Sequence, residues 1–168
     1  MDGDFAEQHN FAITQAKNDW VLFVDADERI SEPLSKEVVL ATKSDEHNVY
    51  SLTRHDFMWG KWLINGEVGA FRSVRLMKKG SGTWVRRVHQ YFKTAEAVVE
   101  LNNPILHYPH KNLVKFVKNI DQWSTLHAEA NIEEGKSSNL LKIIFYPIAH
   151  FIKNYIFRLG FLDGMPGL

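Results

Sequence analysis

Apolar and polar residues follow two different periods along the first part of the chain, which indicates a mixture of helices and strands. Apolar side chains recur at helical spacing over 5–17 and again from Ser31 to Ser44, where Pro33 suits the first helical turn. Between these two segments, the run 20–24 is apolar without a break. Such a run is typical of a strand buried on both faces, in the middle of a parallel sheet.

The middle of the chain reads as a series of shorter strands. Extended stretches are predicted at 49–58, 73–77, 85–92 and 98–107. A loop rich in glycine and aromatic residues reaches about residue 70, and a turn is expected at 78–82. Helices that alternate with strands in this way predict an α/β fold.

The last third of the chain is predicted to be helical. The segment 111–131 is amphipathic, and Gly135 is expected to end it. The segment 138–159 is apolar almost all round, with Pro147 expected to kink it. Four polar residues interrupt it: Lys142, His150, Lys153 and Arg158. These favour an interfacial helix, or one buried against a partner, over a transmembrane span. We therefore expect two domains, 1–110 and 111–168.

Composition narrows the function classes. The chain has 168 residues, of which 45% are hydrophobic, and a formal net charge of zero. The absence of a basic surplus argues against a nucleic-acid binder. Without cysteine there is no disulfide, thiol nucleophile or thiolate metal site. The acidic N-terminus lacks the apolar core of a signal peptide, so a cytoplasmic location is expected. From Lys136 onward the sequence has four basic residues and one acidic residue. This basic surplus favours binding to a membrane surface.

Carboxylates follow the apolar run directly. Ligands bind beyond the carboxyl ends of parallel strands, and side chains two apart on an extended chain point the same way. Asp25 and Asp27 are therefore expected to converge at the sheet edge, where hard oxygen ligands suit Mg²⁺ or Mn²⁺ carrying a phosphorylated substrate. The alternative is that these carboxylates only end a strand and cap the next helix.

Several short blocks, taken in order, resemble one known family. They are QHNFAI at 8–13, DWVLFVDADER at 19–29, RLMKK at 75–79, RVHQ at 87–90, ILHY at 105–108 and FRLGFLDG at 157–164. Together they resemble the family-2 glycosyltransferases, and in particular the bacterial subgroup that includes lipopolysaccharide-core glycosyltransferases. The resemblance covers nearly the whole chain.

The resemblance implies a GT-A fold and inverting transfer from a nucleotide-activated sugar. Asp25 and Asp27 match the family's D-x-D metal and diphosphate motif, and His107 matches a histidine that completes the metal shell in many GT-A enzymes. Arg72 and Arg75 are candidates for neutralising the leaving diphosphate, since arginine presents a fork matched to phosphate oxygens. The alternatives are a strand-end histidine in a polar pocket and arginines that only carry surface charge.

One departure from the family concerns the general base. The family usually has Val-His-Glu where this chain has Val88-His89-Gln90. An amide cannot accept a proton at neutral pH, and a well-placed base contributes roughly 10²–10⁴ in rate. Either Glu67, Asp56 or His89 acts as the base in place of the missing glutamate, or the protein is catalytically weak.

A second departure concerns length. The nucleotide-binding strands that open a GT-A domain are not in this sequence, so we expect the C-terminal half of such an enzyme, with an exposed strand edge that a homodimer or the missing half covers. The expected partners are a nucleotide-sugar donor and a glycan or lipid-linked acceptor, with peripheral membrane contact through 138–162 on the inner face of the cytoplasmic membrane.

A non-catalytic membrane-associated relative is the alternative. A phosphohydrolase is disfavoured because Arg29 stands where that class has Thr or Val.

Overall fold

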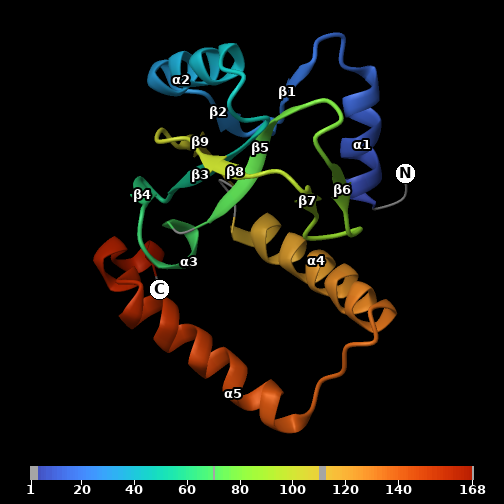
Figure 1. Cartoon of the computed structure of the whole chain (residues 1–168). Coiled ribbons are helices and arrows are strands. Elements are labelled where there is room, and N and C mark those ends of the chain that lie inside the picture. Colours follow the sequence, from blue (N-terminus) through green and yellow to red (C-terminus); the bar gives the residue numbers. More distant parts are fainter. Residues whose placement is uncertain (1–3, 70, 110–112, 168) are drawn as a thin grey trace. The chain divides into compact units, whose positions relative to one another are not determined.

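The structure, a computed structural model, describes residues 4–69, 71–109 and 113–167 (Figure 1). The chain divides into two compact units. Unit 1 comprises residues 1–53 and 72–105, and unit 2 comprises residues 54–71 and 106–168. This division differs from the boundary expected after residue 110, because the segment 54–71 groups with the C-terminal helices.

Unit 1 contains two helices and most of the strands. The helices are α1 (Phe5–Gln15) and α2 (Glu32–Lys43). The strands are β1 (Trp20–Leu22), β2 (Glu28–Arg29), β5 (Arg72–Lys78), β6 (Thr83–Val85), β7 (Tyr91–Lys93) and β8 (Val98–Glu100), together with the first residues of β3 (Val49–Met58) and of β9 (Ile105–His107).

The main sheet is mixed, so the expectation of a central strand in a parallel sheet is wrong. The strand order is β1-β5-β3-β9-β2, and β4 (Lys61–Leu63) and β8 also pair with β3. β1 and β3 run antiparallel to β5, whereas β8 runs parallel to β3. Among the strands that the structure describes, β1 lies at one end of this order. The α/β class itself is confirmed.

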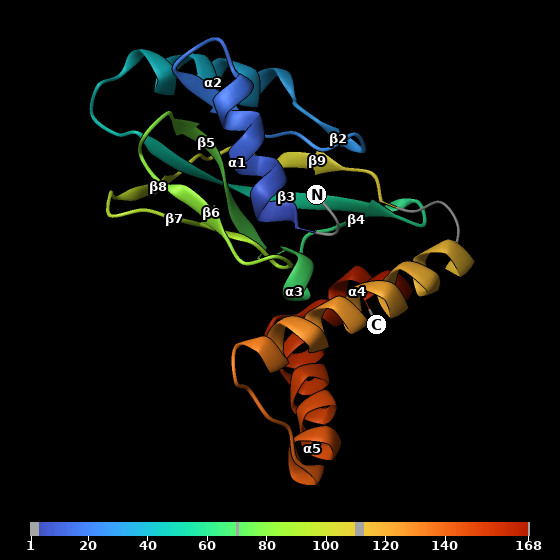
Figure 2. The same cartoon turned by 90° about the vertical axis from the view of Figure 1, so that its right-hand side faces the viewer.

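Side-chain alternation builds one apolar cluster on each face of the sheet. One cluster contains Leu34, Tyr50, Leu52, Leu76, Leu101 and Ile105, and Trp20 and Leu22 pack against it. The other contains Ala6, Val49, Met77, Trp84 and Phe92, with Val21 and Phe23 against it. The apolar run therefore contacts both clusters, although its first four residues are only half-buried and Val24 is exposed. Figure 1 shows α1 and α2 on either side of β1 and β5, and Figure 2 shows α2 lying over the strands of unit 1.

Polar side chains begin the two helices where the sequence indicates. The Asp4 carboxylate accepts a hydrogen bond from Glu7 N at the start of α1. The Ser31 hydroxyl accepts one from Leu34 N at the start of α2, with a proline in the first turn as predicted. These caps satisfy backbone N–H groups that have no partner within the helix.

Two of the expected strands are interrupted. The stretch 85–92 contains a loop between β6 and β7, which pair with one another in a separate two-stranded sheet. The stretch 98–107 is broken between β8 and β9, where Glu37 of α2 accepts hydrogen bonds from Asn102 and Asn103. Burial raises the pKa of Glu37, but these hydrogen bonds outweigh it and leave the pKa below its ordinary value.

Unit 2 joins a small strand segment to the C-terminal helices. Its elements are the ends of β3 and β9, β4, α3 (Gly66–Gly69), α4 (Leu113–Glu133), α5 (Leu140–Phe151), the π-helical turn η1 (Ile152–Phe157) and the 3₁₀ turns η2 (Gly160–Asp163) and η3 (Met165–Gly167). Gly135 has φ +70° and donates to Ile132 O, so it ends the α4 region as predicted. The segment expected to be one helix over 138–159 changes at residue 152 from α-helix to a π-helical turn.

A buried aspartate holds the C-terminal segment in place. Asp163 is 2% exposed, and its carboxylate accepts hydrogen bonds from Ile64 N, Asn65 N and Asn65 Nδ2 at 2.8–3.1 Å. Gly160 is required nearby, because a Cβ there would lie 2.8 Å from Asn154 O. These contacts explain why the block at 157–164 groups with the segment 54–71.

Replacing Asp163 with alanine is expected to destabilise unit 2. The change leaves two backbone N–H groups and an amide without their acceptor, and hydrogen bonds to a charged group contribute about 1.5–3 kcal/mol each before partial compensation by water. We expect the free energy of unfolding in urea to fall by about 2–4 kcal/mol. The matched control is Asp121→Ala on the exposed side of α4, which should change little. Equal urea midpoints for the two variants would contradict this role of Asp163.

Candidate functional site

The D-x-D segment forms a tight turn. Glu28 N donates to Asp25 O at 3.0 Å, which closes the turn, and Asp25 N donates back to Glu28 Oε2 at 2.9 Å. Ala26 and Asp27 lie between them. The extended backbone from which Asp25 and Asp27 were expected to share a side is absent: the strand ends at Leu22, and the chain turns at residues 26 and 27.

A bulge in β5 positions Arg75 against this turn. Tyr50 pairs with Leu76 and Ser51 pairs with Val74, so Arg75 is the extra residue. Bulges redirect a side chain in this way and are common beside functional sites. Arg75 Nη2 donates to Glu28 Oε1 at 2.9 Å, and both Nη atoms lie 3.3 Å from Asp25 Oδ2.

The side chains of Asp25, Glu28 and Arg75 differ in how far they are buried, and this indicates different roles. The side chains of Arg75 and Glu28 are 10% and 0% exposed, whereas that of Asp25 is 56% exposed. Asp27 is also exposed. Arg75 and Glu28 thus form a buried ion pair that fixes the turn, and the turn presents carboxylates to solvent. The sequence showed Glu28 only as a third carboxylate. Its pairing depends on the bulge, which no sequence pattern indicates.

Residues 8–13 lie in α1 and pack beside Phe23, near the end of the apolar run that leads into the turn with Asp25 and Asp27. The Asn10 side chain donates to Trp84 O and accepts from Trp84 N, both at 2.9 Å, so it pairs with β6 as a neighbouring strand would. The His9 ring lies 4.5 Å from the Phe23 ring and 4.7 Å from the Trp84 ring, measured between centroids. These contacts fix the end of the apolar run just before Asp25.

The loop that carries Val88, His89 and Gln90 has an unusual backbone. Arg86 and His89 have φ values of +76° and +51°, in the left-handed region that non-glycine residues rarely adopt. Val88 between them is buried, His89 is exposed and Gln90 is half-buried. Strain of this kind persists where surrounding contacts impose it, often at functional sites. The loop therefore presents the His89 imidazole to solvent.

The other predicted donor-binding arginine has a different environment. Arg72 Nε lies 2.6 Å from Glu100 Oε1, and the two side chains are 60% and 38% exposed. Glu100 also accepts from Thr53 Oγ1 at 2.7 Å. Arg72 is thus in a surface ion pair, whereas Arg75 is in a buried one, so the two arginines are not equivalent.

In unit 2, His107 and Asp56 form a buried pair. His107 Nδ1 lies 2.9 Å from Asp56 Oδ1, and Arg54 binds both oxygens of the same carboxylate at 2.8 and 3.2 Å. Asp56 is 4% exposed. A carboxylate at one ring nitrogen of a histidine fixes the tautomer and ring orientation, an arrangement common behind metal-ligating histidines. Asp56 is therefore suited to orienting His107 more than to acting as a solvent-accessible base.

The remaining candidate, Glu67, lies in unit 2 on α3. Its carboxylate accepts a hydrogen bond from Asn154 Nδ2 at 3.0 Å. His89 and Gln90 belong to unit 1, so the candidates for the general base come from both units.

The residues of unit 1 fit a hydrated divalent cation. Within the described part of the chain, no group of three or more His, Asp and Glu side chains gathers into a metal centre. Mg²⁺ and Mn²⁺ are commonly held by one or two carboxylates, with water and substrate phosphates completing the shell. The exposed carboxylates of Asp25 and Asp27 meet that requirement.

Comparison with known proteins points to glycosyltransferases. No family model matches the chain. The lipopolysaccharide core biosynthesis glycosyltransferase LpsC of Rhizobium meliloti (strain 1021) is 27% identical over an alignment of 174 positions, which covers 97% of this chain and 64% of that protein. Uncharacterized glycosyltransferases of Rickettsia typhi and Rickettsia bellii are each 23% identical, over 97% of this chain and 60% of their own length.

These relatives confirm the resemblance to glycosyltransferases, and they support a transferase by that resemblance. The chain spans about 60–64% of the length of these curated relatives.

Proposed function

We propose that the chain is part of an inverting, metal-dependent glycosyltransferase of the GT-A fold. It would transfer a sugar from a nucleotide-sugar donor to a cell-envelope glycan or lipid-linked acceptor. The observation that carries the proposal is the solvent-facing Asp25–Asp27 turn, held from behind by the buried pair of Arg75 and Glu28. The glycosyltransferase names of the relatives support the reaction class.

The donor site in this proposal uses the two exposed carboxylates. Asp25 and Asp27 would hold Mn²⁺ or Mg²⁺, and we propose His107 as the further ligand that the family resemblance implies. A bound cation supplies positive charge to the diphosphate as it leaves. We propose that Arg72, which is 60% exposed, adds positive charge to the diphosphate. Arg75 holds the turn in position and acts on the diphosphate only indirectly, through its ion pair with Asp25.

Transfer requires a group that accepts the proton of the acceptor hydroxyl. The hydroxyl oxygen attacks the anomeric carbon, the bond to the diphosphate breaks on the opposite face, and the proton leaves for a base. The Gln90 amide can position the hydroxyl but cannot take its proton. We assign the base to the exposed imidazole of His89, with the Glu67 carboxylate as the other candidate.

The C-terminal segment supports the proposed acceptor and location. Within the described residues, the stretch Leu140–Phe157 is long and apolar enough to cross a membrane, and none of it is buried. We propose that 138–162 lies at the inner face of the cytoplasmic membrane, where a lipid-linked acceptor is met. The name of the Rhizobium relative places that protein in lipopolysaccharide core biosynthesis. The edge of β1 would be covered by a second copy or by the rest of the enzyme.

A second candidate is a non-catalytic, membrane-associated relative that acts as a binding or assembly module. Gln90, in the place where the family has glutamate, favours it. This candidate keeps the fold and the membrane contact but has no turnover.

Nucleotide binding tests the proposal directly. Titration of UDP, GDP and ADP by calorimetry, with and without Mn²⁺, should show binding of at least one nucleotide that needs the metal. Asp27→Ala should weaken that binding at least tenfold, because it removes an exposed metal oxygen ligand without touching the Arg75–Glu28 pair. Asp45→Ala, an exposed aspartate after α2, is the matched control. No Mn²⁺-dependent binding by the unaltered chain would favour the non-catalytic candidate.

A further inference from the structure

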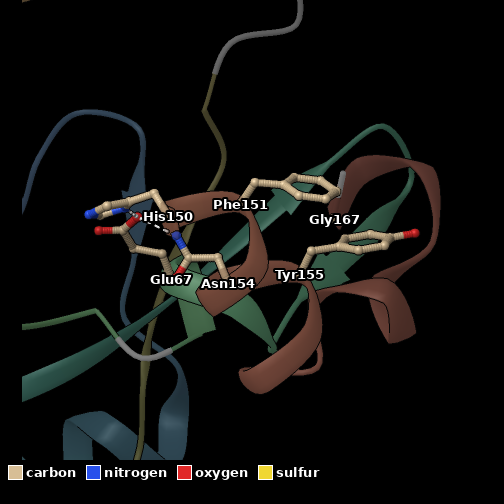
Figure 3. A pocket seen from close by; sticks show the side chains of 6 residues that line it. All are labelled: Glu67, His150, Phe151, Asn154, Tyr155 and Gly167. Carbon is tan, nitrogen blue, oxygen red and sulfur yellow. Dashed lines mark hydrogen bonds and ion pairs between the residues drawn. The ribbon is translucent and has the colours of Figure 1, made fainter. Parts of the chain in front are cut away.

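A pocket of about 290 Å³ lies in unit 2 at the junction of α5 and η1. Its lining comes from four elements of that unit. Glu67 belongs to α3, His150 and Phe151 to the end of α5, Asn154 and Tyr155 to η1, and Gly167 to η3. Figure 3 shows the polar groups of Glu67, His150 and Asn154 close together and the two aromatic rings beside Gly167.

The polar side of the pocket offers both donors and acceptors. Asn154 Nδ2 donates to Glu67 Oε2 at 3.0 Å, and His150 Nδ1 lies 3.9 Å from the same oxygen. The Glu67 side chain remains 62% exposed, so much of its carboxylate faces solvent. A carboxylate, an amide and an imidazole in one place can hydrogen-bond to neighbouring hydroxyl groups, which each donate and accept.

The other side of the pocket is aromatic. The rings of Phe151 and Tyr155 are stacked, with centroids 5.1 Å apart and planes 17° apart. The phenol of Tyr155 adds a hydroxyl to this apolar surface. A pocket with one hydrogen-bonding wall and one aromatic wall suits a ring that carries hydroxyls at its edge and C–H groups on its face.

The backbone at this place is closely packed. Asn154 and Tyr155 lie in the π-helical turn, a feature that is rare in helices and frequent at functional sites. Behind them, a Cβ at Gly160 would lie 2.8 Å from Asn154 O, so the turn is packed closely against η2. The pocket is therefore supported by the same segment that Asp163 fixes.

We propose that this pocket binds a saccharide unit of the acceptor. The identification of the saccharide as part of the acceptor rests on the proposed function. The preference of the pocket for a saccharide rests on its lining residues alone. The pocket takes His150 and Phe151 from the C-terminal end of α5, a helix whose residues Phe145 and Ile148 are 60% and 52% exposed. A sugar joined to a lipid would thus lie at the end of the helix that meets the lipid.

Ligand-observed saturation-transfer NMR on the whole chain tests this inference without any nucleotide donor. The probes are the methyl glycosides of glucose, mannose and galactose, and the chain is kept in a phosphocholine detergent because sugar-based detergents would compete. At least one glycoside should receive saturation, and Glu67→Gln and Asn154→Ala should each reduce the signal several-fold. Circular dichroism checks that both variants are folded.

Glu133→Gln on the exposed part of α4 is the matched control and should keep the full signal. Absence of saturation for all three glycosides, or an equal signal in Glu67→Gln and the control, would overturn the inference. Since no donor is present, failure of Mn²⁺-dependent nucleotide binding leaves this result standing, and the two proposals can fail separately.

Discussion

Replacing Arg75 with alanine is expected to lower the free energy of unfolding by about 3–5 kcal/mol, because it leaves a buried carboxylate without its partner. Glu28 has a side chain that is 0% exposed, and Arg75 Nη2 is its ion-pair partner at 2.9 Å. Breaking a buried pair in this way costs more than the pair itself contributes, since the remaining charge cannot reach water. Chemical unfolding in urea, followed by tryptophan fluorescence, measures the change.

Arg72→Ala is the natural control, because Arg72 lies on the same strand in an ion pair that is 60% and 38% exposed. Surface pairs contribute about 0–1 kcal/mol, so this variant should unfold almost as the unaltered chain does. The double variant Arg75→Met with Glu28→Met removes both charges and should recover much of the loss. Equal destabilisation by Arg72→Ala and Arg75→Ala would contradict the distinction between the two arginines.

Much of the fold of unit 1 could be predicted from local patterns. The capping side chains of Asp4 and Ser31 begin helices through contacts within three residues, so the sequence nearby contains the information. In unit 2, Gly135 ends a helix for the same local reason. The apolar run 20–24 contacts both apolar clusters but is only partly buried, and it could not reveal that the neighbouring strand is antiparallel. That choice depends on β5, about fifty residues later.

The candidate site was predictable only in its exposed part. Asp25 and Asp27 were identified because carboxylates after an apolar strand are unusual. The role of Glu28 was not visible, since it depends on a single extra residue in β5 that directs Arg75 toward it. Asp56 is a similar case. Its pairing with Arg54 two residues away is local, but its contact with His107 joins residues far apart in the chain. Whether His107 ligates the metal stays a prediction.

The second large effect concerns membrane binding by α5 and η1. The whole chain is expected to co-sediment with vesicles that contain anionic lipid and to be released by high salt. Side chains all round α5 are exposed, among them Leu141, Ile143 and Phe145, each at 60% or more. A helix buried on one side needs an apolar stripe only a little over 100° wide. The additional apolar surface of α5 must therefore contact lipid or another protein surface. Anionic lipid is favoured by Lys142 and Lys153 on the same segment.

Charge and apolar surface can be tested separately. Lys142→Gln with Lys153→Gln should weaken binding to anionic vesicles by about 2 kcal/mol, or 30-fold, since each basic residue near the surface contributes about 1 kcal/mol. Lys36→Gln with Lys43→Gln on α2 makes the same change of net charge elsewhere and should have little effect. Ile144→Asp should reduce binding to anionic and zwitterionic vesicles alike, because it removes apolar surface that both lipids cover.

The outcomes distinguish three arrangements of this segment. Release by salt, with a need for anionic lipid, supports a helix lying in the interface, where the polar groups of His150 and Asn154 can stay in contact with water. Sedimentation that withstands both high salt and alkaline carbonate would instead indicate that Leu140–Phe157 crosses the bilayer, a length of helix that just suffices. Failure to sediment with any lipid, together with a stable dimer in which Ile144→Asp abolishes association, would show that the apolar surface is an interface between two copies, and the interfacial arrangement would be wrong.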